Sequence, residues 1–369
     1  MSVKVFSFFS GAGFLDLGFE KSGFEVVFAN EISKDFASGY KFAREQMGIA
    51  SPKYGVNQED ICSYFRTDGK LDILKENIDN ERQGGNLVGF IGGPPCPDFS
   101  VAGKNEGAEG KHGVLSQVYM DLICATLPDF FLFENVKGLW RTAKHKVFFN
   151  QLVKQAEEHN YCLTYRLVNS LEYGAPQDRD RILLIGVKKS LLPLGEEQST
   201  MDAFPWTTGN WRPLEDIKAM NWPQISDFGD LVSLPPDGID KTLCVEYWFR
   251  KNDVTNHPNA NDYFQPKAAL KKMLHIGEGD VSRKAYKRLH RWRFSPTVAY
   301  GNNEVHWHPY YQRRLSAAEA LALQSLPKEF VLPPDMTLSA KFKTIGNGVP
   351  YILSKSIAER LYSFLSSLS

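Results

Sequence analysis

The chain has 369 residues, of which 43% are hydrophobic and 23% are charged, and 43 lysines and arginines balance 43 acidic residues. This composition is typical of a water-soluble globular protein with one large domain or two of ordinary size. No apolar run approaches the roughly 18–20 residues that span a bilayer, which argues against a membrane protein.

The cysteines and the N-terminus indicate a cytoplasmic protein. The five cysteines, at positions 62, 96, 124, 162 and 244, are odd in number and form no C-x-x-C pair. This pattern argues against a disulfide framework and against a zinc site, so we expect no bound metal and a reducing compartment. The first residues lack the basic head and cleavage site of a signal peptide.

Strand-like and helix-like segments alternate along the first 190 residues. We expect strands at 3–9, 24–30, 87–93, 130–136 and 181–187, and helices from Phe14 to about Glu20, at 113–127 and at 145–160. Such alternation predicts an α/β fold with a doubly wound, mostly parallel sheet. Beyond residue 190 the segments are short and irregular, and helical spacing returns at 316–327 and 351–365.

A glycine-rich turn follows the first expected strand. Gly11 and Gly13 form the turn, and Glu31 ends the second strand twenty residues after Gly11. In this architecture such residues hold an adenosine cofactor, although a plain structural turn explains the glycines equally well. Asp16 replaces the third glycine of the dinucleotide fingerprint, and an acidic residue there disfavours a pyrophosphate. An adenosine cofactor without phosphates, S-adenosylmethionine, therefore fits better than a dinucleotide.

The stretch GGPPCPDFS at 92–100 sets Cys96 behind two glycines and two prolines, directly after an apolar run. Prolines fix the backbone and glycines allow close approach, so both are poor neighbours for a cysteine that only fills a core. The stretch is either a rigid turn with a buried thiol or a rigid support for a reactive one.

Basic residues concentrate late in the chain. Residues 241–314 hold 14 lysines and arginines against 6 acidic residues, together with five of the eight histidines and many aromatic residues. Such a segment is either a phosphate-binding surface or the solvated face of a small tryptophan-rich domain, and composition alone does not separate the two.

Six segments in order carry a family resemblance. They are FSGAG at 9–13, GGPPCPDFS, FENV at 133–136, QDRDR at 177–181, RRLSAAEALALQSLP at 313–327 and GNGVP at 346–350. The set resembles the cytosine-C5 DNA methyltransferases of bacterial restriction–modification systems, over about 1–190 and 285–369. The resemblance implies a catalytic and cofactor-binding domain at 1–190 plus 330–369, with the methyltransferase Rossmann-like fold, and a target-recognition domain at 191–329. It also implies S-adenosylmethionine as cofactor and double-stranded DNA as partner. We further expect a monomer in the cytoplasm, associated with the nucleoid, beside a separately acting restriction endonuclease.

The resemblance assigns catalytic roles to four residues. Cytosine C5 is a poor nucleophile, so these enzymes first add a cysteine thiolate to C6 of a flipped base. Cys96 matches the nucleophile, and Glu134 matches the residue that protonates or hydrogen-bonds N3 and the exocyclic amine. Arg179 and Arg181 match the arginines near the base, one bracing the carboxylate and the other the base O2. Being two apart, they are expected to point the same way on a strand.

The resemblance also implies a cofactor site and shows three departures from the family pattern. The cofactor residues are Phe9, Gly11, Ala12, Gly13 and Phe14 of the methionine and adenine loop, Glu31 on the ribose, Ile32 on adenine, Asp60 and Ile61 at the adenine edge, and Pro95, Leu115, Asn347 and Val349 of the remaining wall. Pro97 replaces a usual glutamine, Phe14 a usual glycine and Gly348 a commoner serine. These departures concern the local geometry of the loops and not the reaction class.

Three alternatives are open at this point. A tRNA cytosine-C5 methyltransferase is built on the same scaffold, but such enzymes resemble PPCQPFT at the cysteine and lack so large a basic segment. A nicotinamide-dependent oxidoreductase leaves Cys96, Glu134 and Arg179 unexplained. A catalytically inactive DNA-binding module is disfavoured by the intact Cys96 and Glu134. Thr242–Leu243 resembles a short recognition pair of the family, and the target sequence is not decoded.

Overall fold

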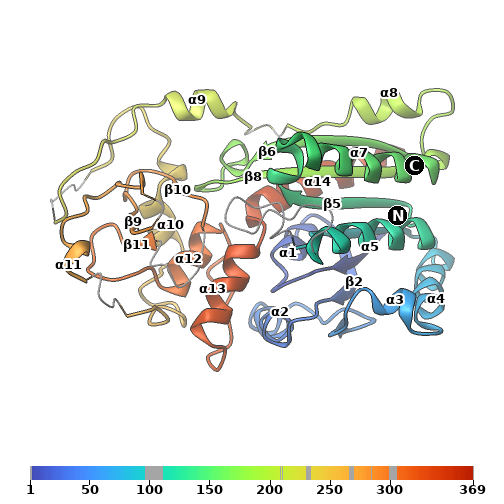
Figure 1. Ribbon diagram of the computed structural model, residues 1–369, viewed down its shortest axis with the longest axis horizontal. Coiled ribbons are helices and arrows are strands. Elements are labelled where there is room, and N and C mark those ends of the chain that lie inside the picture. The colour runs from blue at the N-terminus through green and yellow to red at the C-terminus, as the bar shows by residue number, and fades with distance from the viewer. Residues whose placement is uncertain are drawn as a thin grey trace.

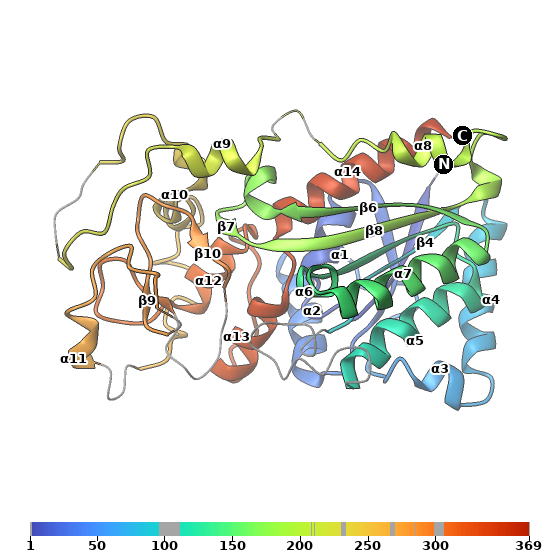
Figure 2. The same ribbon diagram turned by 45° about the horizontal axis from the view of Figure 1, so that its top comes forward.

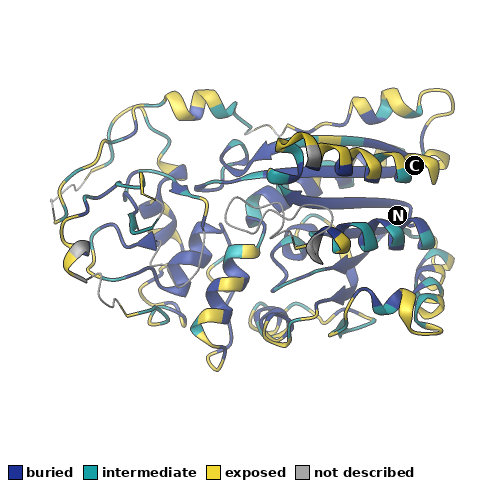
Figure 3. Cartoon of the chain, viewed as in Figure 1, coloured by how far each residue is buried: buried dark blue, intermediate teal, exposed yellow. Residues whose placement is uncertain are grey.

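The computed structural model describes residues 2–95, 111–207, 209, 211–229, 234–265, 270–283, 285–298 and 306–368. Figure 1 shows a sheet flanked by helices on one side of the molecule and a lobe of short elements on the other. The strands of the sheet are buried, whereas the outer faces of the surrounding helices are exposed (Figure 3). Cys96 and the segment to residue 110 lie outside the described residues.

One seven-stranded sheet has the order β3–β2–β1–β4–β5–β8–β6. Strands β1 to β5 run parallel, and β8 runs antiparallel to both β5 and β6. The predicted mostly parallel α/β fold is confirmed. The strands are β1 (Val3–Phe8), β2 (Phe24–Asn30), β3 (Val56–Asn57), β4 (Leu87–Gly92), β5 (Phe130–Val136), β6 (Tyr161–Asn169) and β8 (Asp180–Lys188).

Strands β3 and β6 were not among the expected strands. Strand β6 lies at the edge of the sheet, where fewer positions need apolar side chains. Its middle residues, including Thr164 and Arg166, are half-buried or exposed and give no continuous apolar run. The five expected strands, in contrast, have apolar residues facing both layers of helices.

Alternate side chains of the strands enter two separate cores, as the period of two in a strand requires. Phe6, Phe8 and Phe90 pack with one set of helices, whereas Val3 and Ile91 pack with the other. The first set is α4 (Lys70–Gln83), α5 (Lys111–Thr126) and α7 (Ala143–Glu158), and the second is α1 (Phe14–Glu20) and α14 (Tyr351–Ser367). Figure 2 shows α5 and α7 side by side along one face, with α14 across the sheet from them.

The remaining helices connect the sheet or build the second lobe. Beside the sheet lie α2 (Lys34–Gln46), α3 (Ser63–Arg66), α6 (Gly138–Arg141) and the 3₁₀ helices Ser170–Tyr173 and Lys189–Leu191. After them come α8 (Glu197–Asp202), α9 (Leu214–Ala219), the 3₁₀ helix Lys241–Leu243, α10 (Val245–Lys251), α11 (Leu270–Met273), α12 (Ala317–Leu323) and α13 (Leu338–Asn347). Short strands are β7 (Gln177–Asp178), β9 (Lys287–Arg288), β10 (Ser295–Pro296) and β11 (His306–Trp307).

Helix α12 is shorter than the predicted helix at 316–327. It begins after Ser316, whose hydroxyl accepts from the Glu319 N–H, and it is followed by Gln324 and by Ser325 with φ of 56°. A left-handed residue cannot continue a right-handed helix, so the chain turns there. Ala317, Leu321 and Leu326 share a core with Phe14 and Leu17 of α1, which joins this part of the chain to the sheet lobe.

The register of the sheet brings the carboxyl ends of β1, β2 and β4 level with Phe133, near the end of β5. Phe8 of β1 pairs with Asn30 of β2 and with Gly92 of β4, and Gly92 pairs with Phe133 of β5. The residues that follow these positions therefore emerge together at the carboxyl edge. Strands β1 and β4 flank the point where the strand order reverses, which is where open α/β sheets bind ligands.

Candidate active site

The glycine turn after β1 has a backbone that few residue types adopt. Phe9, Gly11 and Gly13 have φ values of 54°, 57° and 82°. The N–H of Gly13 donates to the Ser10 carbonyl at 2.8 Å, and the N–H of Ser10 donates to the Asn30 carbonyl at 3.0 Å. Positive φ is uncommon for a bulky residue such as Phe9 and indicates a turn held in place by its surroundings.

Glu31 is joined to this turn by its carboxylate. Its Oε2 accepts from the Gly11 N–H at 2.9 Å, and its Oε1 accepts from the Ser33 N–H at 2.8 Å. Burial raises the pKa of Glu31, and the two backbone bonds oppose this rise. The neighbouring Ile32 is 66% exposed, so an apolar side chain stands open beside a buried carboxylate. The carboxylate can accept hydrogen bonds from the hydroxyls of a sugar, and the apolar side chain of Ile32 can pack against a flat ring beside it.

Asp16 does not face the turn, contrary to the sequence argument that used its charge there. The side chain is fully buried and accepts from the Ser7 hydroxyl at 2.8 Å and from the Tyr40 hydroxyl at 2.9 Å. Arg44 lies in the same interior and pairs with Glu20 at 3.0 Å. A Cβ on Gly13 would lie 2.2 Å from Arg44 Nη1, so this network packs directly against the turn and requires glycine there.

The other expected cofactor residues lie at the same sheet edge or close behind it. Asp60 is exposed and accepts from the Cys62 N–H at 3.0 Å, whereas Ile61 is buried. Asn30 donates to the Glu59 carbonyl at 3.0 Å, which holds this loop beside the end of β2. Ala12 and Val349 are buried, Leu115 is half-buried, and Pro95 and Asn347 are exposed. The side chain of Phe14 is buried in a core, so its backbone is the part accessible from the turn.

Glu134 lies directly behind the segment that leads to Cys96. A Cβ on Gly93 would lie 2.4 Å from Glu134 Oε2, so the backbone of Gly93 rests against this carboxylate. Asn135 donates from Nδ2 to the Pro94 carbonyl at 3.4 Å. Asn135 belongs to the FENV segment but was not among the expected site residues, although its position beside Glu134 was a signal for it. Cys96 itself is outside the described residues.

The four described cysteines are free and buried. Burial raises the pKa of Cys124 and of Cys244 to about 12, and it also raises the pKa values of Cys62 and Cys162. Such thiols stay protonated at neutral pH, and inert buried cysteines behave in this way. None of the four is suited to nucleophilic attack.

Arg181 forms an ion pair with Glu134. Strand β8 runs antiparallel to β5, with Arg181 opposite Val136 and Leu183 opposite Glu134. Arg181 Nε lies 2.5 Å from Glu134 Oε1, and both side chains are about nine-tenths buried. Arg181 Nη1 also donates to the Asp180 carbonyl at 2.8 Å. The cation therefore fixes the orientation of the carboxylate.

Arg179 has a different setting from Arg181, although the spacing predicted a shared direction. It lies between β7 and β8 and is 1% exposed. Its guanidinium donates to the Gly346 carbonyl at 2.8 Å, to the Asn347 carbonyl at 3.4 Å and to Gln177 Oε1 at 3.3 Å. Arg179 thus binds the GNGVP loop, and its contact with a base stays a prediction.

Two buried glutamines also hold this region together, and the sequence argument did not single them out. Gln177 is fully buried and donates to the Leu323 carbonyl at 3.2 Å, while its Oε1 accepts from the Val298 N–H at 3.2 Å. Gln324 donates to the Gly348 carbonyl at 3.4 Å. Both residues lie within the quoted motifs QDRDR and RRLSAAEALALQSLP, but their role depends on contacts between distant segments.

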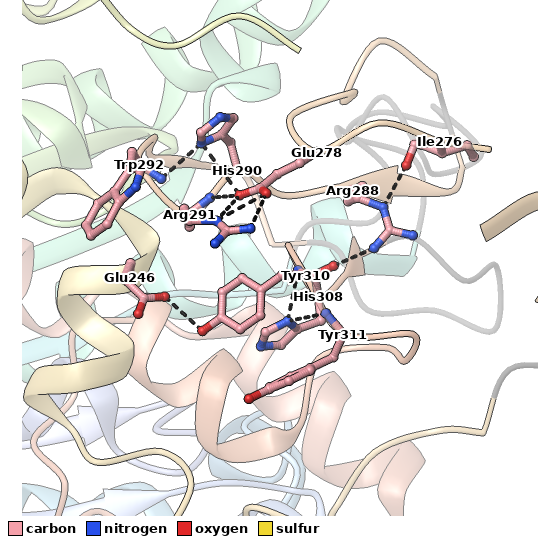
Figure 4. A network of polar contacts seen from close by, with 10 residues as sticks. All are labelled: Glu246, Ile276, Glu278, Arg288, His290, Arg291, Trp292, His308, Tyr310 and Tyr311. Atoms are coloured by element: carbon pink, nitrogen blue, oxygen red, sulfur yellow. Dashed lines mark hydrogen bonds and ion pairs between the residues drawn. The ribbon is translucent and has the colours of Figure 1, made fainter. Parts of the chain in front are cut away.

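Many cations of the basic segment 241–314 have structural partners. Arg291 pairs with Glu278 at 2.7 Å, the Tyr310 hydroxyl donates to Glu246 at 2.9 Å, and Arg288 donates to the His308 carbonyl at 2.8 Å. Figure 4 shows these residues and the dashed lines between them. Burial lowers the pKa values of His257, His290 and His308, which favours their neutral forms. Part of the positive charge of this segment is therefore neutralised or hydrogen-bonded within the lobe and is not available to a partner.

A basic hollow remains at the surface of this lobe. It has a volume of about 550 Å³ and is lined by Pro235, Lys241, Tyr247, Arg250, Lys251 and Trp292. Its described lining includes no acidic residue, although Arg250 pairs with Glu246 at 2.7 Å. Lys251 Nζ lies 4.2 Å from the centre of the Trp248 ring. A second hollow of about 320 Å³ adjoins Asp178 and Lys218, which form an ion pair at 3.1 Å. Thr242 is exposed and Leu243 is buried beside the first hollow.

Among the described residues, no three His, Cys, Asp or Glu side chains gather as metal ligands. None of the helices in this part of the chain has the length and apolarity needed to cross a membrane.

Comparisons with known proteins agree with this geometry. The family model of the C-5 cytosine-specific DNA methylases matches residues 3–363. The chain is 54% identical over 365 residues to the Type II methyltransferase M.NmeDI of Neisseria meningitidis serogroup C, covering 98% of this chain and 84% of that protein. It is 27% identical to the Type II methyltransferase M.MthTI of Methanothermobacter thermautotrophicus, covering 98% and 97% of the two chains. A solved structure of a DNA modification methyltransferase encoded within an E. coli prophage superposes with a TM-score of 0.65 at 24% identity, covering 99% and 100% of the chains, and supports the fold.

Proposed function

Because this chain belongs to the C-5 cytosine-specific DNA methylase family, we propose that Cys96 attacks C6 of a flipped cytosine while Glu134 holds N3. The enzyme methylates cytosine at C5 in DNA. The family match does not favour the two alternative activities, a tRNA methyltransferase or a nicotinamide-dependent oxidoreductase. The observation that carries the proposal is the Arg181–Glu134 ion pair at 2.5 Å, against which the backbone before Cys96 rests.

The reaction follows from the chemistry of these groups. The Cys96 thiolate forms a bond to C6, and the electron pair of the C5–C6 double bond moves so that C5 becomes nucleophilic. Glu134 contacts N3 and the exocyclic amine as charge develops on the ring, and Arg181 keeps the carboxylate in place. C5 would then accept a methyl group as the sulfur–methyl bond of the donor breaks, and a base would remove the original hydrogen from C5, so that the C5–C6 double bond re-forms and the Cys96 thiolate leaves.

The cofactor we propose is S-adenosylmethionine, which supplies an electrophilic methyl group when bound. The residues present fit it. The Glu31 carboxylate accepts one hydrogen bond from the Gly11 N–H and one from the Ser33 N–H. Its remaining lone pairs are available to the ribose hydroxyls. Ile32 offers an exposed apolar surface for adenine, and the turn at 9–13 offers backbone groups for the methionine portion. The remaining contacts we propose are those of Asp60, Ile61, Pro95, Leu115, Asn347 and Val349.

We propose that the substrate is a specific sequence in double-stranded DNA and that residues 191–329 bind it. The hollow with Lys241, Arg250 and Lys251 supports this assignment, because cations beside aromatic rings suit a phosphate backbone. The catalytic domain is then 1–190 plus 330–369. Since the relatives include Type II methyltransferases, we propose that the enzyme protects host DNA as a cytoplasmic, nucleoid-associated monomer beside a separate endonuclease.

A fluorinated substrate tests the covalent mechanism. The target is first found by sequencing 5-methylcytosine in the DNA of a methylation-free host that expresses the protein. A duplex with 5-fluorocytosine at that position should then trap the enzyme after methyl transfer, because fluorine cannot be removed as a cation. We expect a band that survives denaturing electrophoresis, requires S-adenosylmethionine and disappears in Cys96→Ser.

Two outcomes would contradict the proposal. Enzyme that methylates the normal duplex but gives no shifted band with the fluorinated one would exclude covalent attack by Cys96. Methylation found in the RNA of the host and absent from its DNA would overturn the assigned substrate.

A further inference from the structure

Gly348 has a backbone that does not require glycine. Its φ of −62° and ψ of 151° are extended values that any residue adopts. A Cβ at this position would nevertheless lie 2.1 Å from Cδ2 of Phe14, 2.6 Å from Cε2 and 2.9 Å from Cγ. The Phe14 ring, rather than the conformation of the chain, therefore excludes a side chain at position 348.

The ring of Phe14 has little room to move aside. It is 2% exposed, and Phe330 meets it edge-on with ring centres 5.1 Å apart. Leu17, Leu326 and Ile345 belong to the same core. Because protein interiors are close-packed, a displaced ring would have to push these neighbours out of their positions. Phe14 is also the first residue of α1, directly after the glycine turn.

The loop around Gly348 is held on its other sides by polar side chains from distant segments. Arg179 donates to the Gly346 carbonyl at 2.8 Å, and Gln324 donates to the Gly348 carbonyl at 3.4 Å. At the end of α13, Thr344 Oγ1 lies 3.9 Å from where a Cβ of Gly11 would be. The GNGVP loop therefore lies against the glycine turn, with Phe14 between the two segments.

We propose that Phe14 and Gly348 act as one unit that sets the spacing between the two cofactor loops, 9–13 and 346–349. The ring contacts the Gly348 backbone and leads directly into the glycine turn, so a change in its size moves both loops together. Gly348 is a glycine because the ring occupies the place of its side chain. Phe14 and Gly348 are thus positioning residues, and their two departures from the family pattern are a single packing change. This inference rests on the proposed cofactor site.

A double-mutant cycle tests the coupling, with S-adenosylhomocysteine as the probe. Binding is measured by calorimetry and stability by urea unfolding without ligand, for Gly348→Ser, Phe14→Ala and the double variant. Overpacking of a core costs enough that Gly348→Ser should weaken binding by about tenfold or more. Phe14→Ala should also weaken binding. The double variant should recover at least about fivefold over Gly348→Ser, because neighbouring residues are not additive.

The control is Gly209→Ala, which adds a methyl group at a position where no atom of the described neighbouring residues lies within 4 Å. It should leave binding unchanged. In steady-state kinetics, Gly348→Ser should raise KM for the methyl donor far more than it lowers kcat, whereas general unfolding would lower the apparent kcat and leave KM unchanged. If Gly348→Ser does not fold, Gly348→Ala with and without Phe14→Leu provides the same cycle.

The inference is overturned if Gly348→Ser binds S-adenosylhomocysteine as the unchanged chain does, or if the double variant binds no better than Gly348→Ser. It is also overturned if the two substitutions have additive effects on the free energy of unfolding measured in urea. A failure of the proposed function is distinguishable from these results. In that case the unchanged chain binds no S-adenosylhomocysteine, and the urea cycle still reports the coupling.

Discussion

Replacing Glu31 with glutamine is expected to destabilise the unliganded protein. The two carboxylate oxygens accept from Gly11 at 2.9 Å and from Ser33 at 2.8 Å. Glutamine has one oxygen, so its amino group would face the other N–H and leave a buried donor without an acceptor, at a cost of about 1–3 kcal/mol. Burial raises the pKa of Glu31, so losing the charge also removes a desolvation cost. The net loss should therefore lie in the lower half of that range.

The same substitution is expected to weaken cofactor binding. A charge-assisted hydrogen bond to a ribose hydroxyl contributes about 1.5–3 kcal/mol, which corresponds to roughly a 10- to 150-fold change in Kd. Urea unfolding without ligand and calorimetry with S-adenosylmethionine measure the two effects separately. Glu45→Gln, at an exposed position of α2, is the matched control and should change neither. Unchanged stability and unchanged affinity in Glu31→Gln would refute the role derived for this carboxylate.

Two further predictions concern buried ion pairs. Arg181→Ala should cost about 3–5 kcal/mol in urea unfolding, because it leaves the Glu134 carboxylate buried without its partner, and it should slow single-turnover methylation. Lys137→Ala, which breaks the more exposed pair with Asp180, should cost about 0–1 kcal/mol, and equal effects in the two variants would contradict the argument. Glu319 accepts hydrogen bonds from Arg313, Ser316 and His308, and despite its burial Arg313 and His308 lower its pKa from 4.5 to about 2. Because its folded pKa lies below the unfolded value, its contribution of about 3 kcal/mol is present above pH 4.5 and is lost as the pH falls toward 2. The stability difference between the unchanged chain and Glu319→Gln should therefore shrink by about 2 kcal/mol between pH 5 and pH 3, and a constant difference in urea would exclude this linkage.

The sequence by itself determined the sheet and the location of the site. Apolar residues on both faces of β1, β2, β4 and β5 require helices on both sides, and parallel strands end at one edge. Glu31 was therefore expected beside the turn at 11–13, and the structure joins them through the Gly11 N–H. Glu134 was expected at the end of its strand for the same reason. These conclusions depend on local periodicity and on the ends of strands, which a sequence shows directly.

Tertiary structure alone decided which way several site residues point. Asp16 turns inward to Ser7 and Tyr40, and Arg179 diverges from Arg181 because it lies between two strands rather than within one. The sequence pattern also failed to predict the edge strand β6 and the acidic partners of the basic lobe, because polar residues show no clear periodicity of hydrophobic positions. Phe14 and Gly348 meet across more than 300 positions of the chain, and this contact comes from the packing of α1 against the end of α13. Propensity and spacing act over a few residues, whereas such contacts exist once the whole core has formed.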